Sequence, residues 1–136
     1  MKDLQSDLKE LVALNPATIS SSTTTSGAII DLQGYEGVMF VLQTGARTDG
    51  TYTPLIQEGD DSGLSDAAAV ADADLLPSGT GQEASAAISA ANSVSKIGYR
   101  GTKRYVRLQV VSSGVSSGAI IGGTAILGFP TNAPIA

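Results

Sequence analysis

The chain has 136 residues, a formal net charge of −5, only 15% charged residues and 16 glycines. This length fits one domain with a real hydrophobic core, whereas ordinary soluble domains carry roughly 25% charged residues. The acidic balance excludes a typical nucleic-acid-binding protein, because neutralising phosphates requires an excess of Lys and Arg.

Apolar residues recur at helical spacing over residues 3–14, which predicts a short amphipathic helix ended by Pro16. The members of this stripe are Leu4, Leu8, Leu11 and Val12. A helix of this length is marginal alone in water, so it must pack on something. We expect Leu4, Leu8 and Leu11 to contact a partner, with docking on the chain's own domain as the alternative. The Ser/Thr-rich tract 17–27 predicts an extended linker. We therefore expect an N-terminal arm and linker over 1–27.

Residues 28–136 are expected to form one domain of short strands. The expected strands are 28–33, 37–44, 51–58, 94–99, 103–112 and 119–128. Turn-forming residues separate most of them, for example at 33–37, 48–50 and 112–114. Closely spaced strands of this kind predict an all-β fold, an antiparallel β-sandwich resembling a jelly roll.

Two stretches are less regular. Residues 38–42 are apolar at every position, so that strand is expected to be buried on both faces or to meet a second subunit. The alanine-rich section 64–93 has helical propensity around 67–76 and 84–91, but helices there would interrupt the run of strands. We favour strand or irregular structure for both.

Residues 95–111 are predicted to form a hairpin with its bend near Gly98 and Gly101. Its second arm alternates, with Val106, Leu108 and Val110 on an inward face expected to pack against residues 38–42. Five of the eight Lys and Arg residues lie in this segment. We call them the basic ribbon: Lys96, Arg100, Lys103, Arg104 and Arg107. Arg100, Lys103 and Arg107 are expected at a partner interface, with pairing to Asp31, Glu36 or Glu58 as the alternative.

No motif in the sequence completes a catalytic site, and no catalytic residue is expected. Residues 114–118 match G-x-S-x-G, but the chain has no histidine to activate the serine. Residues 93–96 spell S-x-x-K without the companion motifs of penicillin-binding enzymes. The Gly79-Thr80-Gly81 sequence follows no hydrophobic strand, as a dinucleotide site would require.

The remaining chemistry is that of carboxylates. The acidic turns offer hard oxygen ligands, but their spacing does not fit a calcium-binding EF loop. These residues are Glu58, Asp60, Asp61, Asp66, Asp72 and Asp74. The chain has no cysteine or histidine for transition metals, so no metal or other cofactor is expected. A carboxylate-based glycoside hydrolase stays the enzymatic alternative.

Several phrases in this order resemble a family of small tailed-phage virion proteins, the capsid decoration or cement proteins and minor structural proteins. The phrases are residues 31–37 (DLQGYEG), 48–54 (TDGTYTP), 58–61 (EGDD), 71–75 (ADADL), 96–99 (KIGY), 103–107 (KRYVR), 128–130 (GFP) and 133–135 (API). The resemblance runs from about residue 28 to the end of the sequence. The Ser/Thr tract and the alanine-rich section match it less well.

The resemblance implies a decoration protein on the capsid surface of a virion, bound to the major capsid protein and assembled as a homo-oligomer, a dimer or trimer. The implied alternative is a tail, baseplate or carbohydrate-binding receptor module, which usually needs aromatic platforms. No apolar run reaches the roughly 18 residues of a membrane span, and the first residues are too polar for a secretory signal. We therefore expect synthesis in the host cytoplasm and no membrane partner.

Overall fold

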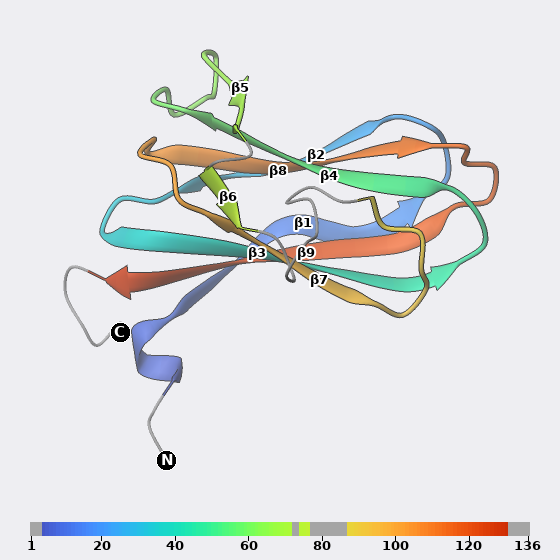
Figure 1. Cartoon of the computed structure of the whole chain (residues 1–136), viewed down its shortest axis with the longest axis horizontal. Coiled ribbons are helices and arrows are strands. Elements are labelled where there is room, and N and C mark those ends of the chain that lie inside the picture. The colour runs from blue at the N-terminus through green and yellow to red at the C-terminus, as the bar shows by residue number, and fades with distance from the viewer. Residues whose placement is uncertain (1–3, 72–73, 77–86, 131–136) are drawn as a thin grey trace.

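The computed structural model describes residues 4–71, 74–76 and 87–130, which form two antiparallel sheets (Figure 1). Sheet A has the strand order β1-β9-β3-β7-β6, and sheet B has the order β2-β8-β4-β5. The strands are β1 Lys9–Ile19, β2 Thr24–Asp31, β3 Tyr35–Arg47, β4 Thr51–Gly59, β5 Ala68–Ala69, β6 Leu75–Leu76, β7 Val94–Tyr99, β8 Tyr105–Ser113 and β9 Ala119–Pro130. A single 3-10 turn, η1 Gln5–Asp7, precedes β1 in the described part of the chain.

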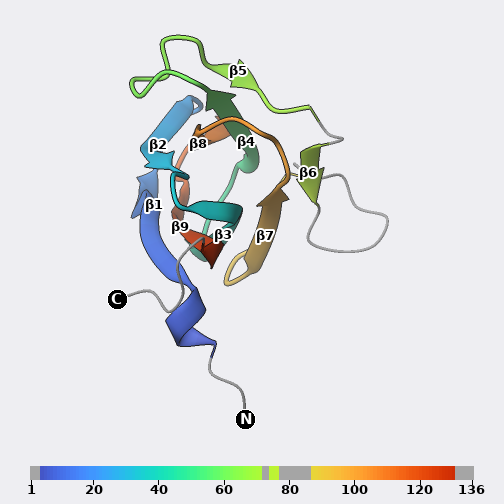
Figure 2. The same ribbon diagram turned by 90° about the vertical axis from the view of Figure 1, so that its left-hand side faces the viewer.

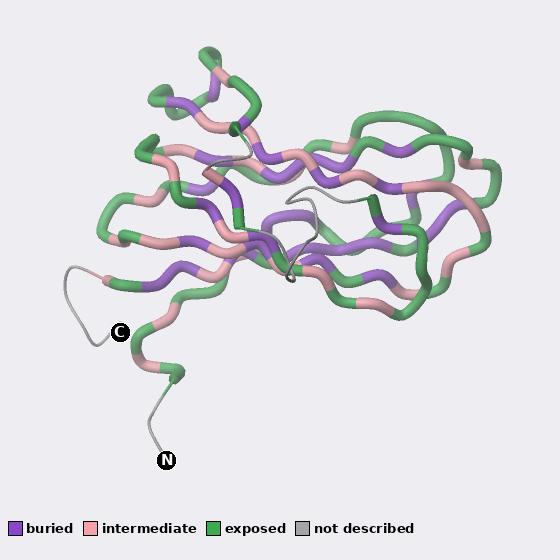
Figure 3. Tube along the Cα trace, in the orientation of Figure 1, coloured by how far each residue is buried: buried purple, intermediate pink, exposed green. Residues whose placement is uncertain are grey.

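The two sheets pack face to face, as Figure 2 shows from the end of the molecule. Buried residues alternate with partly buried or exposed ones along the long strands (Figure 3), so each sheet has one inward and one outward face. The predicted all-β antiparallel sandwich is confirmed. Six strands were expected close to where β2, β3, β4, β7, β8 and β9 lie.

The core lies between β8 and the middle of sheet A. Val106, Leu108 and Val110 are at most 1% exposed and share one cluster with Phe40 and Leu42 of β3. Leu108 reaches the opposite sheet, because a Cβ added at Gly123 of β9 would come within 2.9 Å of Leu108 Cδ2. The expected inward face of residues 103–112 is therefore confirmed.

The helix predicted over residues 3–14 is wrong. Only η1 is helical in its described part, and residues 9–19 form β1, which pairs with β9. Ala13 and Leu14 are consecutive and both buried, because the register shifts between Val12 and Leu14 and again before Ala17. A bulged strand places apolar residues at irregular intervals, and this spacing resembled a helical stripe.

The linker predicted over 17–27 is also wrong. Residues 17–19 complete β1, and β2 starts at Thr24 and pairs with β8 as an edge strand of sheet B. Hydroxyl groups there have structural partners, since Ser26 Oγ accepts a 2.8 Å hydrogen bond from the Gln109 side chain. Residues 9–31 thus belong to the sandwich, and the expected division at residue 27 does not separate an arm from a domain.

The hairpin predicted over 95–111 is the third correction. β7 pairs with β3 and β6 in sheet A, whereas β8 pairs with β2 and β4 in sheet B. The chain crosses from one sheet to the other through residues 100–104. Alternation along a strand identifies its buried face but not its neighbour, so the pairing was not readable from the pattern.

The alanine-rich section contains no α-helix in its described part. It contains the two-residue strands β5 and β6, and Ile88 forms an isolated bridge with Tyr52 of β4. Residues 72–73 and 77–86 lie outside the described residues, and with them the Gly79-Thr80-Gly81 sequence. The expected turns at Gly34, Gly50 and Gly114 are present, each with a positive φ angle.

Candidate partner-binding surfaces

Most of the basic ribbon is engaged within the chain. Lys103 Nζ lies 2.8 Å from Asp60 Oδ2, and Arg104 makes two 2.9 Å hydrogen bonds to Asp31. The Arg104 hydrogen bond lowers the pKa of the Asp31 carboxyl, and the same contact raises the pKa of Arg104. Of the alternatives expected for the ribbon, pairing with Asp31 is therefore present, although through Arg104.

The ribbon is not one surface. Arg107 points outward from sheet B and donates hydrogen bonds of 3.2 and 2.5 Å to Gln57 Oε1 on β4. Lys96 points outward from β7 of sheet A. Arg100 is exposed between β7 and β8, and its side chain has no hydrogen-bond or ion-pair partner among the described residues. Of the three cations expected at an interface, Arg100 is the one without such a contact.

The three leucines expected to contact a partner have different positions. Leu4 is 74% exposed, whereas Leu11 packs against the core. Leu8 lies over the outward face of β9, because a Cβ at Gly128 would be 3.2 Å from Leu8 Cδ2. These residues do not form one helical stripe.

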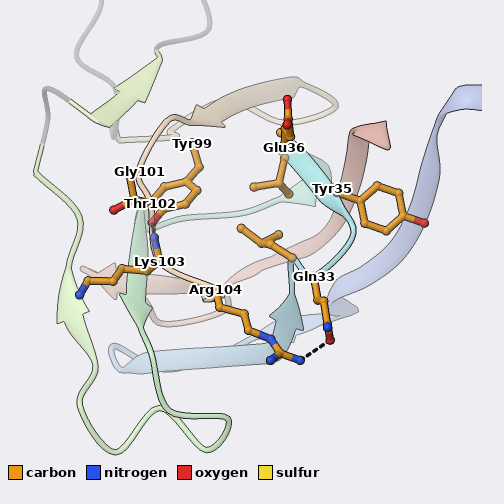
Figure 4. Close-up of a pocket in the computed structure, with 11 residues that line it drawn as sticks. Gln33, Tyr35, Glu36, Tyr99, Gly101, Thr102, Lys103 and Arg104 are labelled. Atoms are coloured by element: carbon orange, nitrogen blue, oxygen red, sulfur yellow. Dashed lines mark hydrogen bonds between the residues drawn. The ribbon is translucent and has the colours of Figure 1, made fainter. Parts of the chain in front are cut away.

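A cleft of about 370 Å³ opens at one end of the sandwich, between the β2–β3 turn and the β7–β8 connection (Figure 4). It presents both signs of charge, with Glu36 on one side and Lys103 and Arg104 on the other. The Tyr35 ring points away from Tyr99 in Figure 4. Tyr99 itself is 6% exposed, so its ring offers little surface on which a sugar could stack.

Tyr99 joins the two sheets beside this cleft. Its hydroxyl donates a 2.5 Å hydrogen bond to Glu58 Oε2 and accepts one from the Lys103 backbone N–H. Burial and the bond to Glu58 raise the pKa of Tyr99 above its ordinary value. The phenol therefore stays protonated at neutral pH, as the donor to Glu58.

In the acidic turns, carboxylates accept hydrogen bonds from backbone N–H groups. Asp61 accepts hydrogen bonds from the N–H groups of Gly63 and Ser65, and Asp66 accepts them from Asp60 and Asp61. These bonds lower the pKa of both carboxyls. Among the described residues, no group of three or more acidic side chains is arranged to hold a metal ion.

The G-x-S-x-G sequence is a turn. The Asp49 carboxylate accepts hydrogen bonds from the backbone N–H groups of Ser116, Ser117 and Gly118, at distances from 2.9 to 3.2 Å. These contacts, with that to Gly118 foremost, lower the pKa of Asp49. They connect the β3–β4 turn to the β8–β9 turn.

The outward face of sheet A is an apolar surface that extends across four strands. We use this name for the outward positions of its four longest strands: Glu10 and Val12 of β1; Ile120, Gly122, Thr124 and Ile126 of β9; Met39, Val41 and Gln43 of β3; and Val94, Lys96 and Gly98 of β7. Val12, Val94 and Ile120 are 57%, 66% and 43% exposed. Among these described positions only Glu10 and Lys96 carry charge. A shallow groove of about 330 Å³ runs across the face.

Several glycines on the outward side of sheet A are covered by a neighbouring apolar side chain. A Cβ added at the glycine would come within 2.9 to 3.5 Å of the covering side chain in every case. The pairs are Gly122 with Pro16, Gly37 with Phe129, Gly98 with Leu76, Gly128 with Leu8 and Gly45 with Ile120. Phe129 is 77% exposed and adopts a φ of 52°, an uncommon conformation for a bulky residue.

The outward face of sheet B is different. It combines the apolar residues Ile29, Leu55 and Val111 with polar side chains that bond to each other, as Gln109 does with Ser26 and Arg107 with Gln57. The difference between the two faces was only partly readable from the sequence. The uninterrupted apolar stretch 38–42 was the signal, and Met39 and Val41 are its half-buried outward members.

The comparisons with known proteins give a fold and no family. No family model matches the chain, and no curated protein matches it. Among solved structures, the chain is similar to the crystal structure of the SPBc2 prophage-derived protein YomS. The TM-score is 0.55 at 13% identity, over 88% of this chain and 93% of that chain. No helix in the described ranges is long and apolar enough to cross a membrane.

Proposed function

We propose that this protein is a structural component of a phage virion, a decoration protein that binds the outer surface of the major capsid protein lattice. The observation that carries the proposal is the outward face of sheet A. An apolar, nearly uncharged sheet face on a small acidic protein is a surface for another protein subunit. A shell offers many copies of one site, so modest contacts multiply into stable attachment.

Two independent likenesses support the phage assignment. The phrases between residues 31 and 135 resemble tailed-phage virion proteins. The fold is similar to that of a prophage-derived protein along nearly the whole chain. Neither likeness includes a catalytic signature. On this proposal the protein has no enzymatic activity, no cofactor and no nucleic-acid partner, and it acts on the virion surface after synthesis in the host cytoplasm.

The test is to find the chain in the particle. Shells of the encoding phage are assembled without this protein, mixed with the purified chain, and imaged by cryo-electron microscopy. We expect extra density at repeated positions on the outer shell surface and co-sedimentation that saturates at a fixed ratio to the capsid protein. Recovery with tails or baseplates, or binding on a glycan array with no binding to shells, would replace decoration by the tail or receptor-binding alternative.

A further inference from the structure

The outward face of sheet A is large enough to form a protein interface. Four strands at roughly 4.8 Å spacing give a width of about 19 Å, and the stretch from Ile120 to Gly128 is about 27 Å long at roughly 3.4 Å per residue. The flat area is thus about 500 Å² per copy, or about 1,000 Å² for a face packed on its equal, which is near the lower limit of specific interfaces. An interface of this size forms a weak, reversible complex.

The two charges on the face lie on opposite sides of its apolar centre. Glu10 lies on β1, next to Ile126 in the register, and Lys96 lies on β7, next to Val41. A two-fold axis parallel to the strands and passing between β9 and β3 would place β1 of one copy over β7 of the other. Measured along the strand direction, each Glu10 would then lie two residues, or about 7 Å, from the partner's Lys96. A lysine side chain spans that offset.

We infer that a second copy of this chain covers the outward face of sheet A, in a symmetric dimer with this axis. A two-fold interface must be complementary to itself. One acid and one base on opposite sides of an apolar centre meet this requirement, because the axis generates two equivalent pairs of Glu10 and Lys96. Thr124 and Ile126 of β9 pack over Val41 and Met39 of the other copy. The dimer covers the same face that the proposed function assigns to the shell, so it is a form of the free protein that must dissociate before this face binds a shell subunit.

The inference concerns the free protein and goes beyond the proposed function, so the two can fail separately. Sedimentation velocity of the full chain, from about 1 µM to about 1 mM, should show a monomer–dimer equilibrium in the micromolar range. Val41→Glu should abolish the dimer. Glu10→Lys and Lys96→Glu should each weaken it about tenfold, and the double variant should restore it to within about threefold of the wild type.

The matched control is Thr53→Glu on the outward face of sheet B, which should leave dimerisation unchanged. Thermal unfolding of every variant confirms that it is folded, and the exposed positions 10 and 96 keep the charge test valid if Val41→Glu does not fold. A wild-type monomer throughout the range overturns the dimer. A double variant that stays weak overturns the axis. If the wild type is monomeric and Val41→Glu abolishes shell binding, the face belongs to the shell, and the dimer is wrong while decoration stands.

Discussion

The Tyr99 hydroxyl donates a 2.5 Å hydrogen bond to Glu58 Oε2, and this contact links β7 of sheet A to β4 of sheet B. The two residues are 41 positions apart in the sequence. Their contact lies beside the connection that takes the chain from one sheet to the other, and it fixes that connection through the Lys103 N–H as well.

Tyr99→Phe should therefore lower the free energy of unfolding by about 1–2 kcal/mol, because a buried hydroxyl that bonds a carboxylate is lost. Urea denaturation measures the change. Tyr35→Phe is the matched control, since the Tyr35 hydroxyl has no hydrogen bond to the described residues, and it should change stability by less than about 0.5 kcal/mol. Equal effects in the two variants would show that the bond to Glu58 does not stabilise the fold.

Leu108→Ala should cost about 2–5 kcal/mol, since the side chain is fully buried and its removal leaves a cavity against Gly123. Leu55→Ala on β4 is the control, because Leu55 faces outward and is only partly buried. Denaturant titration of both variants gives the comparison. A loss below about 0.5 kcal/mol for Leu108→Ala would mean that residue 108 is not in the core.

Stability should fall in acid through Asp49. Its pKa is lowered in the folded chain by the backbone hydrogen bonds of Gly118, Ser117 and Ser116. The stabilisation is therefore present above the ordinary value of 3.8 and is lost as the pH falls below it through the folded pKa. Melting temperatures between about pH 6 and pH 2 should show this loss in the wild type and less of it in Asp49→Asn.

Asp7→Asn is the control for this experiment. It removes one negative charge at an exposed position in η1, and the Asp7 carboxylate accepts no hydrogen bond from the described residues. The loss of stability in acid that is due to Asp49 should therefore be retained in this variant. Identical pH profiles for Asp49→Asn and the wild type would exclude Asp49 as a source of acid sensitivity.

Removal of residues 1–8 should leave the sandwich folded, whereas removal of residues 1–20 should unfold it. The longer truncation deletes β1, with the buried residues Ala13, Leu14 and Ile19, and exposes β9 as a new edge. Circular dichroism and amide hydrogen exchange measure the outcome, and residues 9–19 should be protected in the full chain. Fast exchange of residues 9–19, together with a folded 21–136 fragment, would show that β1 belongs to a detachable arm.

Arg100→Glu should reduce shell occupancy most strongly at low salt, because its cation has no intramolecular partner among the described residues. Arg107→Glu is the matched comparison. It loses its bonds to Gln57 on a partly exposed surface, so it should lower stability by no more than about 1 kcal/mol and leave occupancy unchanged. Co-sedimentation with shells at two salt concentrations separates the variants. A loss of occupancy only for Arg107→Glu would place the interface on sheet B.

The sequence predicted the strands whose buried face follows strict alternation. Val106, Leu108 and Val110 are an example, because a period of two residues is legible without knowing the neighbouring strand. It failed at β1, where bulges disturb the period, and at the β7–β8 connection, where the partner of each strand depends on contacts distant in sequence. The basic ribbon illustrates the same limit. Proximity in sequence suggested one surface, but Lys96 and Arg107 lie on different sheets.

The covered glycines of sheet A carry a consequence for the divergence of this fold. At Gly122 a methyl group would come within 2.9 Å of Pro16 Cγ, so position 122 cannot gain a side chain while Pro16 stays in place. Homologues in which position 122 has gained a side chain should have a smaller residue at position 16, and the pair at Gly98 and Leu76 should vary in the same coupled way. Evolution of this surface would then proceed through paired replacements and not through single ones.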